Sequence, residues 1–108
     1  MQIQMNTDSN IEGREALLAQ VSAVVEGALS RFSDHITRVE VHLSDVNSDK
    51  GGNDDKRCLM EARLEGRQPI AVAHEAATVH QAVDGAADTL ERFIESTLGR
   101  LRDHYRSV

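Results

Sequence analysis

The fold is decided by residues 78–105, which read TVHQAVDGAADTLERFIESTLGRLRDHY. Apolar residues recur in this stretch at steps of three and four, which is the period of a helix buried along one side. The sequence therefore predicts one long amphipathic helix. Thr78 and Gln81 form a capping-box pair that fixes its start, because the hydroxyl can accept a hydrogen bond from a backbone N–H of the first turn. The apolar stripe consists of Val79, Val83, Ala86, Leu90, Ile94, Leu98, Leu101 and Tyr105.

The length of this predicted helix determines what it can pack against. At about 1.5 Å per residue the helix would be roughly 40 Å long, so it must lie across something wide. A β-sheet formed by the preceding residues is the expected partner. Gly85 and Gly99 lie inside the pattern, and each costs up to about 1 kcal/mol relative to alanine. We therefore expect a break or fraying near Gly99, with residues 99–108 as the frayed end.

The residues before the long helix show two different periods. Four stretches alternate apolar and polar residues, as half-buried strands do, and one stretch has its apolar residues at helical spacing. Pro69 precedes the last of these strands, where it gives up only one donor of the sheet ladder. The predicted elements are strands at 1–6, 38–44, 57–65 and 70–74 and a first helix at 14–33, whose apolar face is Leu17, Val21, Val24, Ala28 and Phe32.

The predicted element order is β-α-β-β-β-α, which indicates the α/β (α+β) class. A four-stranded sheet with two helices packed on one face is the simplest way to bury two helical stripes and four alternating strands. This arrangement is a two-layer sandwich whose other sheet face stays in water. The 108 residues suffice for a single domain, residues 1–108. The predicted core contains Leu17, Val21, Val24, Val39, Val41, Met60, Leu64, Val83, Leu90 and Ile94.

Residues 45–56 are predicted to form a mobile hairpin loop because the segment is rich in Asp, Asn, Ser and Gly. Asp45, Asn47 and Asp49 have the spacing of the first ligands in a calcium loop of the EF-hand type. Such a loop also needs Gly at its sixth position and Glu at its twelfth, and this chain has lysine at both. We therefore expect no calcium site here.

Residue patterns for catalysis are missing from the sequence. The five histidines have neither a two-His helical spacing nor a nearby cysteine, and no phosphate-binding glycine loop, nucleophile elbow or Ser/His/Asp set is found. We predict that the protein is not an enzyme and has no metal site, cofactor or small-molecule substrate. Cys58 is the single cysteine and cannot form an internal disulfide, so it is interpreted as a small buried hydrophobe in a reducing compartment.

The net charge of −6 is spread over the whole chain. Each third of the sequence is slightly acidic, so no general field would attract a phosphate backbone, and any nucleic-acid binding must come from local clusters of Arg and Lys. No apolar run is long enough to cross a membrane and the first residues lack the basic start of a signal peptide. A cytoplasmic protein with no membrane partner is expected.

Four pieces of sequence carry a family resemblance through their order and spacing. They are Met1-Gln2-Ile3, Asn10-Ile11-Glu12 followed by Glu15-Ala16-Leu17, the run from Ile36 to Leu43 with its Val-x-Val-x-Leu end, and Ala82-Val83-Asp84-Gly85 leading to Asp88, Leu90 and Arg92. Together they resemble the ribosome hibernation promoting factor family, also called ribosome-associated inhibitors or sigma-54 modulation proteins (S30Ae). The likeness covers nearly the whole chain.

The resemblance implies a short, single-domain member without the C-terminal dimerisation domain of the long form. Such proteins bind the small ribosomal subunit, both rRNA and ribosomal proteins, in the channel used by mRNA and tRNA, and so inhibit translation and promote ribosome hibernation under stress or in stationary phase. A monomer or weak homodimer is expected. The alternative is an acidic paralogue that acts as a protein–protein interaction module without ribosome binding. The bases expected to contact the ribosome are Lys56, Arg57, Arg63, Arg67, Arg92, Arg100 and Arg102.

The long helix departs from the family pattern in its charge. Thr89 and Ser96 stand where a base is common in the family, and Glu91 and Glu95 add acid. Since each phosphate contact releases counterions and contributes to affinity, fewer bases imply weaker and more salt-sensitive occupancy of the ribosome.

Local ion pairs are the alternative interpretation of the bases. Arg92 can pair with Asp88 or Glu95 on its own helix, an interaction worth only about 0.3–0.5 kcal/mol. Bases on the third predicted strand can pair across strands with Glu40. A base that is used in this way is a poorer candidate for phosphate binding.

Overall fold

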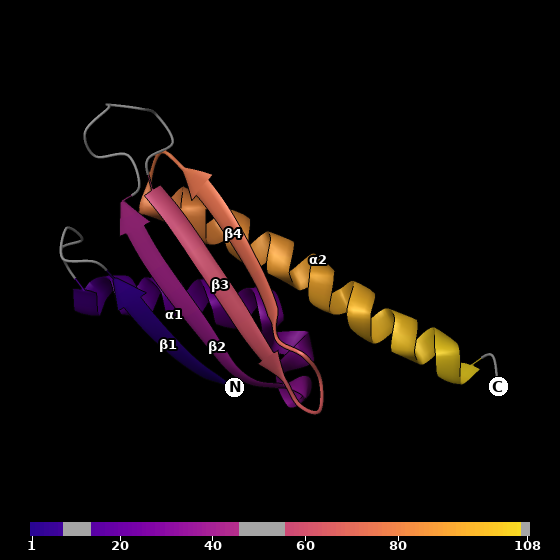
Figure 1. Ribbon diagram of the computed structural model, residues 1–108. Coiled ribbons are helices and arrows are strands. Elements are labelled where there is room, and N and C mark those ends of the chain that lie inside the picture. The colour runs from indigo at the N-terminus through magenta and orange to yellow at the C-terminus, as the bar shows by residue number, and fades with distance from the viewer. Residues whose placement is uncertain (8–13, 46–55, 107–108) are drawn as a thin grey trace.

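The computed structural model describes residues 1–7, 14–45 and 56–106, the last seven as helix backbone only. The elements are β1 (Gln2–Thr7), α1 (Arg14–Leu29), a 3-10 helix η1 (Ser30–His35), β2 (Ile36–Asp45), β3 (Lys56–Leu64), β4 (Ile70–Ala76) and α2 (Val79–Arg106). The strands form one sheet in the order β1-β2-β3-β4. β1 is parallel to β2, and the other neighbours are antiparallel. Both helices lie on the same side of the sheet (Figure 1). The predicted two-layer fold is confirmed.

The long helix α2 begins where its cap predicts. The backbone N–H of Gln81 donates to the hydroxyl oxygen of Thr78 at 3.1 Å, which satisfies one of the free donors of the first turn. The helix then continues through Gly99 to Arg106, so the expected break in the backbone is absent. Fraying of its last turns stays a prediction. The C-terminal half of α2 extends beyond the sheet (Figure 1).

Gly85 in α2 has a packing role. A Cβ atom built at this position would lie 2.2 Å from Cδ2 of His74 on β4, far closer than any real contact. The missing side chain therefore lets α2 approach the imidazole ring of an adjacent strand. This close approach offsets the usual cost of glycine within a helix.

The first helix differs from its prediction in length and in its buried face. α1 ends at Leu29 and the chain continues as 3-10 helix to His35, where an α-helix to Ser33 was expected. Val25 and Leu29 are fully buried, whereas Val24 and Ala28 are only partly buried beside the core. Because Val24 and Val25 are adjacent, the helical period fits an apolar stripe through either one. The stripe that is buried repeats every four residues from Leu17 through Val25 to Leu29. The other nine predicted core residues are buried as expected.

The strand ends also extend beyond their predicted limits. β2 continues to Asp45 and β3 starts at Lys56, where these two residues pair across the ladder. Their side chains form an ion pair of 3.1 Å. The rest of the predicted mobile loop 45–56 lies outside the described residues. The expected absence of calcium binding stays a prediction.

Cys58 lies in the core on the helix-facing side of β3 and is fully buried. Burial raises the pKa of its thiol from 9.0 to about 12. At neutral pH this lowers the thiolate fraction roughly a thousandfold, and the thiolate is the reactive form.

We therefore expect the folded protein to react with Ellman's reagent only at the rate at which Cys58 is exposed by opening of the core. The measurement is the absorbance increase in buffer and in strong denaturant. Immediate stoichiometric reaction is expected in denaturant, and rapid reaction in buffer would contradict the burial of Cys58.

Candidate functional site

The sheet face that no helix covers is called here the open sheet face. It is formed by the strand residues that alternate with the buried ones, so it carries the polar side of every strand. Its residues are Gln2, Gln4, Asn6, Arg38, Glu40, His42, Ser44, Arg57, Leu59, Glu61, Arg63, Ala71, Ala73 and Glu75.

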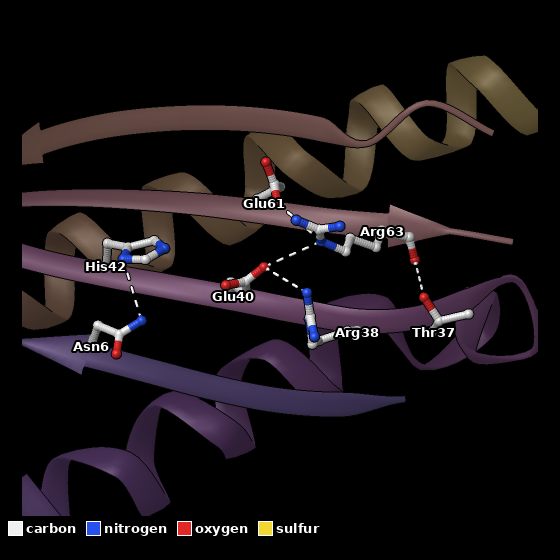
Figure 2. Close-up of polar contacts among 7 residues, drawn as sticks. All are labelled: Asn6, Thr37, Arg38, Glu40, His42, Glu61 and Arg63. Carbon is white, nitrogen blue, oxygen red and sulfur yellow. Dashed lines mark hydrogen bonds and ion pairs between the residues drawn. The ribbon is translucent and has the colours of Figure 1, made fainter.

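Glu40 is the centre of an ion-pair network on this face (Figure 2). Its Oε2 atom accepts hydrogen bonds from the guanidinium of Arg38 and from Nε of Arg63, both at 3.2 Å. Arg63 also lies 3.3 Å from a carboxylate oxygen of Glu61. The register explains the network, because Arg38 is opposite Arg63 and Glu40 is opposite Glu61. Two bases and two acids thus compensate each other within the sheet.

The network changes the titration of Glu40. Desolvation alone would raise the pKa of its carboxyl, but the charge of Arg38 and the hydrogen bond and charge of Arg63 outweigh it, so the pKa is lowered from 4.5. A lowered pKa contributes stability that is present above the unfolded-state pKa and is lost as pH falls through the folded-state value.

The substitution Glu40→Gln is therefore expected to lower the denaturant midpoint at neutral pH and to lose that effect in acid, well below pH 4.5. Urea unfolding followed at several pH values checks this result. An equal loss at every pH would show that the amide disrupts packing and that the charge of Glu40 is unimportant.

Further polar contacts bind the strands together beside this network. The hydroxyl of Thr37 donates to the backbone carbonyl of Arg63 at 3.0 Å. This contact lies at the irregularity in the β2–β3 register between Ile36 and Arg38. The side-chain amide of Asn6 lies 3.4 Å from Nδ1 of His42, which joins β1 to β2 (Figure 2).

The structure separates the predicted ribosome-binding bases into three groups. Lys56, Arg63 and Arg92 are paired with acids of the chain, the last with Asp88 on α2. Arg57 and Arg67 are exposed and form no ion pair with the residues that the structure describes. The side chains of Arg100 and Arg102 lie outside the described residues, although both positions belong to α2.

Arg57 and Arg67 do not form one cluster. Arg57 is the second residue of β3. Arg67 lies in the turn that follows β3, where its backbone N–H donates to the carbonyl of Leu64. At about 3.3 Å per residue the length of β3 separates them by roughly 25 Å. Glu75 lies opposite Arg57 in the β3–β4 register, but no ion pair joins the two side chains. Arg57 and Arg67 thus mark opposite ends of the sheet.

The sequence of this chain matches the model of a known protein family. The family model described as "Sigma 54 modulation protein / S30EA ribosomal protein" matches residues 4–102. The chain belongs to this family. The match spans every element of the fold, from β1 to the last turns of α2. No curated protein matches the sequence significantly.

Two solved structures share the fold of this S30EA family member. The N-terminal domain of Protein Y from Thermus thermophilus has a TM-score of 0.71 and 24% identity, with 90% of this chain and 99% of that chain covered. A ribosomal subunit interface protein from Coxiella burnetii has a TM-score of 0.68 and 20% identity, with 92% and 99% covered. At these identities the likeness shows the fold alone.

The charge of this S30EA domain is divided between its two layers. The four strands hold four basic and four acidic side chains. From Arg14 to His35 and from Val79 to Gly99, the helices hold three Arg against seven acids. Beyond Gly99, α2 has three Arg and one Asp. The acid therefore concentrates on the helix layer, and the sheet and the end of α2 are left as the surfaces that oppose phosphate least.

Two ion-paired arginines were not predicted from the sequence, Arg38 on the open sheet face and Arg31 in the helix layer. Arg38 binds Glu40 and was not among the predicted site residues. Arg31 on η1 binds Glu95 of α2 at 3.1 Å and covers the ring of Phe32. The alternation of charges along β2 could have indicated the pairing of Arg38 with Glu40. The ion pair of Arg31 with Glu95 could not be read from the sequence, because it depends on how η1 packs against α2.

Other kinds of site are not found in the part of the chain that the structure describes. There, no group of three or more His, Cys, Asp and Glu side chains could hold a metal ion. In the same residues, no helix is both long and apolar enough to cross a membrane.

Proposed function

We propose that this protein associates with the small ribosomal subunit and holds ribosomes in a non-translating state. The observation that carries this proposal is the S30EA match over residues 4–102, which begins within β1 and ends within the last turns of α2. The names of the two structural neighbours, a Protein Y domain and a ribosomal subunit interface protein, support it. The compartment would then be the cytoplasm, and the partners rRNA and ribosomal proteins.

The charge distribution favours particular contacts. Arg57 and Arg67 can bind phosphate oxygens without first breaking an ion pair of the described chain. The positions Arg100 and Arg102 add positive charge to the end of α2 that extends beyond the sheet (Figure 1). Paired bases such as Arg63 would have to give up Glu40 and Glu61 for a phosphate, which reduces their net gain.

The acidic helix layer limits this binding. Its excess of acid opposes approach to the phosphate-rich subunit, so the local bases must overcome a repulsive field. We expect occupancy that is weak for the family and falls steeply with salt.

The same acidity supports the second candidate, a paralogue that binds a protein and no ribosome. The observation in its favour is that the bases Lys56, Arg63 and Arg92 are already paired with acids. A pull-down would then retrieve one protein and no ribosomal components.

Translation in a bacterial cell-free extract tests the proposed function. Purified protein added in excess over ribosomes at low salt is expected to reduce synthesis of a reporter in proportion to ribosome occupancy. Bovine serum albumin at the same concentration is the control for added protein. Undiminished synthesis at full excess would refute the inhibitory function.

A further inference from the structure

Phe93 on α2 is an aromatic side chain that the core does not use. It is 55% exposed, whereas Phe32, the other phenylalanine, is 4% exposed and belongs to the core. A single exposed apolar residue is common on protein surfaces. The groups that surround the Phe93 ring therefore decide whether this position can bind a ligand.

The ring lies in a shallow hollow on one side of α2. The hollow has a volume of about 270 Å³ and is lined by Thr89, Arg92, Phe93 and Ser96. These residues are neighbours on the helix surface, because they are three or four positions apart or adjacent. Pockets for drug-sized ligands have volumes of about 300–1,000 Å³, so a single ring system is the size of ligand that fits here.

Arg92 supplies a second flat group beside the ring. Its guanidinium donates a hydrogen bond to the carboxylate of Asp88, one helical turn earlier, and the Arg92 side chain is 73% exposed. A guanidinium donates hydrogen bonds within its own plane, so Asp88 engages an edge and leaves the flat faces available for stacking. Arg92 can therefore contribute its shape while its charge stays paired.

The surroundings of Phe93 favour a nucleobase over a protein partner. No other large exposed hydrophobic residue lies on α2 as far as Gly99, where its described side chains end. The cores of protein interfaces are wider apolar patches. An unpaired base needs one flat apolar face with hydrogen-bonding groups beside it, and the hydroxyls of Thr89 and Ser96 provide such groups. The Thr89 hydroxyl donates to the carbonyl of Gly85 at 2.9 Å, so it can only accept from a base.

The charge of α2 changes sign at the hollow. From Val79 to Glu91 the helix holds three acids and no Lys or Arg, whereas from Arg92 to Arg106 it holds four Arg and two acids. One of those acids, Glu95, is bound by Arg31 at 3.1 Å, and it lies about 200° around the helix from Phe93. The positive half is also the half that extends beyond the sheet (Figure 1). Charge therefore favours a phosphate-bearing ligand at this half of α2.

We propose that Phe93 and Arg92 form a stacking platform for an unpaired base of RNA. The base packs in the hollow against the two flat groups, and the adjoining phosphates follow α2 towards its C-terminus, where the position of Arg100 continues the spacing of Arg92 and Ser96. This inference rests on the proposed function, because the small ribosomal subunit is the RNA that the protein would meet.

The absence of tryptophan from the chain allows a direct test. Phe93→Trp retains a flat ring and introduces a single fluorophore, whose emission is quenched when a base stacks on it. Titration at low salt with a single-stranded RNA oligonucleotide, and separately with purified small subunits, is expected to quench the emission. Leu18→Trp on α1 is the matched control, since Leu18 is also an exposed hydrophobic residue on a helix, and its emission should not change.

The substitution Phe93→Leu separates stacking from charge. Leucine keeps the apolar bulk and favours a helix but has no flat ring, so the affinity for both RNA ligands is expected to fall about fivefold or more. The slope of log affinity against log salt should stay the same, because no charge is changed. Phe93→Tyr keeps the ring and should bind like wild type. Circular dichroism checks that each variant is folded.

The possible outcomes separate this proposal from the proposed function. If wild type binds subunits but the tryptophan is not quenched, or if the Phe93→Leu variant binds equally well, the stacking platform is refuted and ribosome association stands. Emission that shifts to shorter wavelength without quenching would also refute it, since that shift indicates burial against a protein surface. Quenching by the oligonucleotide without subunit binding would support the platform and refute the proposed function. Binding to neither ligand would refute both.

Discussion

The substitution Leu90→Ala is expected to lower the free energy of unfolding by about 2–5 kcal/mol, a large share of the stability of a small domain. Leu90 lies on the sheet-facing side of α2, is fully buried and belongs to the continuous core. Its truncation removes apolar contacts and leaves a cavity that the aliphatic surroundings fill only partly. Urea unfolding followed by circular dichroism measures the change.

The control for this prediction is Arg92→Ala, two residues further along the same helix. Arg92 is exposed and contacts Asp88, so its loss should change stability by only about 0.5 kcal/mol. Equal midpoints for wild type and the Leu90 variant would show that α2 does not pack on the sheet as described.

Replacing Arg57 and Arg67 together by alanine is expected to give the second large effect, a loss of ribosome affinity. If each contacts one phosphate, their removal should lower the slope of log affinity against log salt by roughly two. Core stability should hardly change, because both side chains are exposed. Binding titrations with purified small subunits at several salt concentrations give both the affinity and the slope.

The matched control is Arg63→Ala on the same sheet face. Arg63 forms ion pairs with Glu40 and Glu61, so we expect its loss to change the salt slope less than the loss of Arg57 or Arg67 would. A larger loss for Arg63 than for the double variant would show that internal pairing does not decide which bases meet the ribosome.

The fold could be predicted from sequence because its signals are local. A cap at Thr78 and an unbroken stripe over 28 residues define α2, and alternation defines the strands. The sequence did not show which of Val24 and Val25 is buried, since either residue fits the helical period. The packing of His74 on Gly85 depends on the angle between α2 and β4, which no local pattern encodes.

The candidate site was less predictable, because pairing depends on register. Sequence offered Glu40 as a partner for both Arg57 and Arg63, and the β2–β3 register brings it only to Arg63 while Arg57 lies opposite Ser44. The pair of Arg92 with Asp88 was predictable, since both residues belong to one helix at a spacing of four. Arg100 and Arg102 keep their sequence-based assignment as a prediction.

Sedimentation of the wild-type protein with purified small ribosomal subunits at low salt tests the central claim most directly. We predict that the folded protein sediments with the subunits at low salt and is released steeply as salt approaches the physiological range. Folded protein that remains in the supernatant at low salt would contradict ribosome association and would transfer the function to a protein partner.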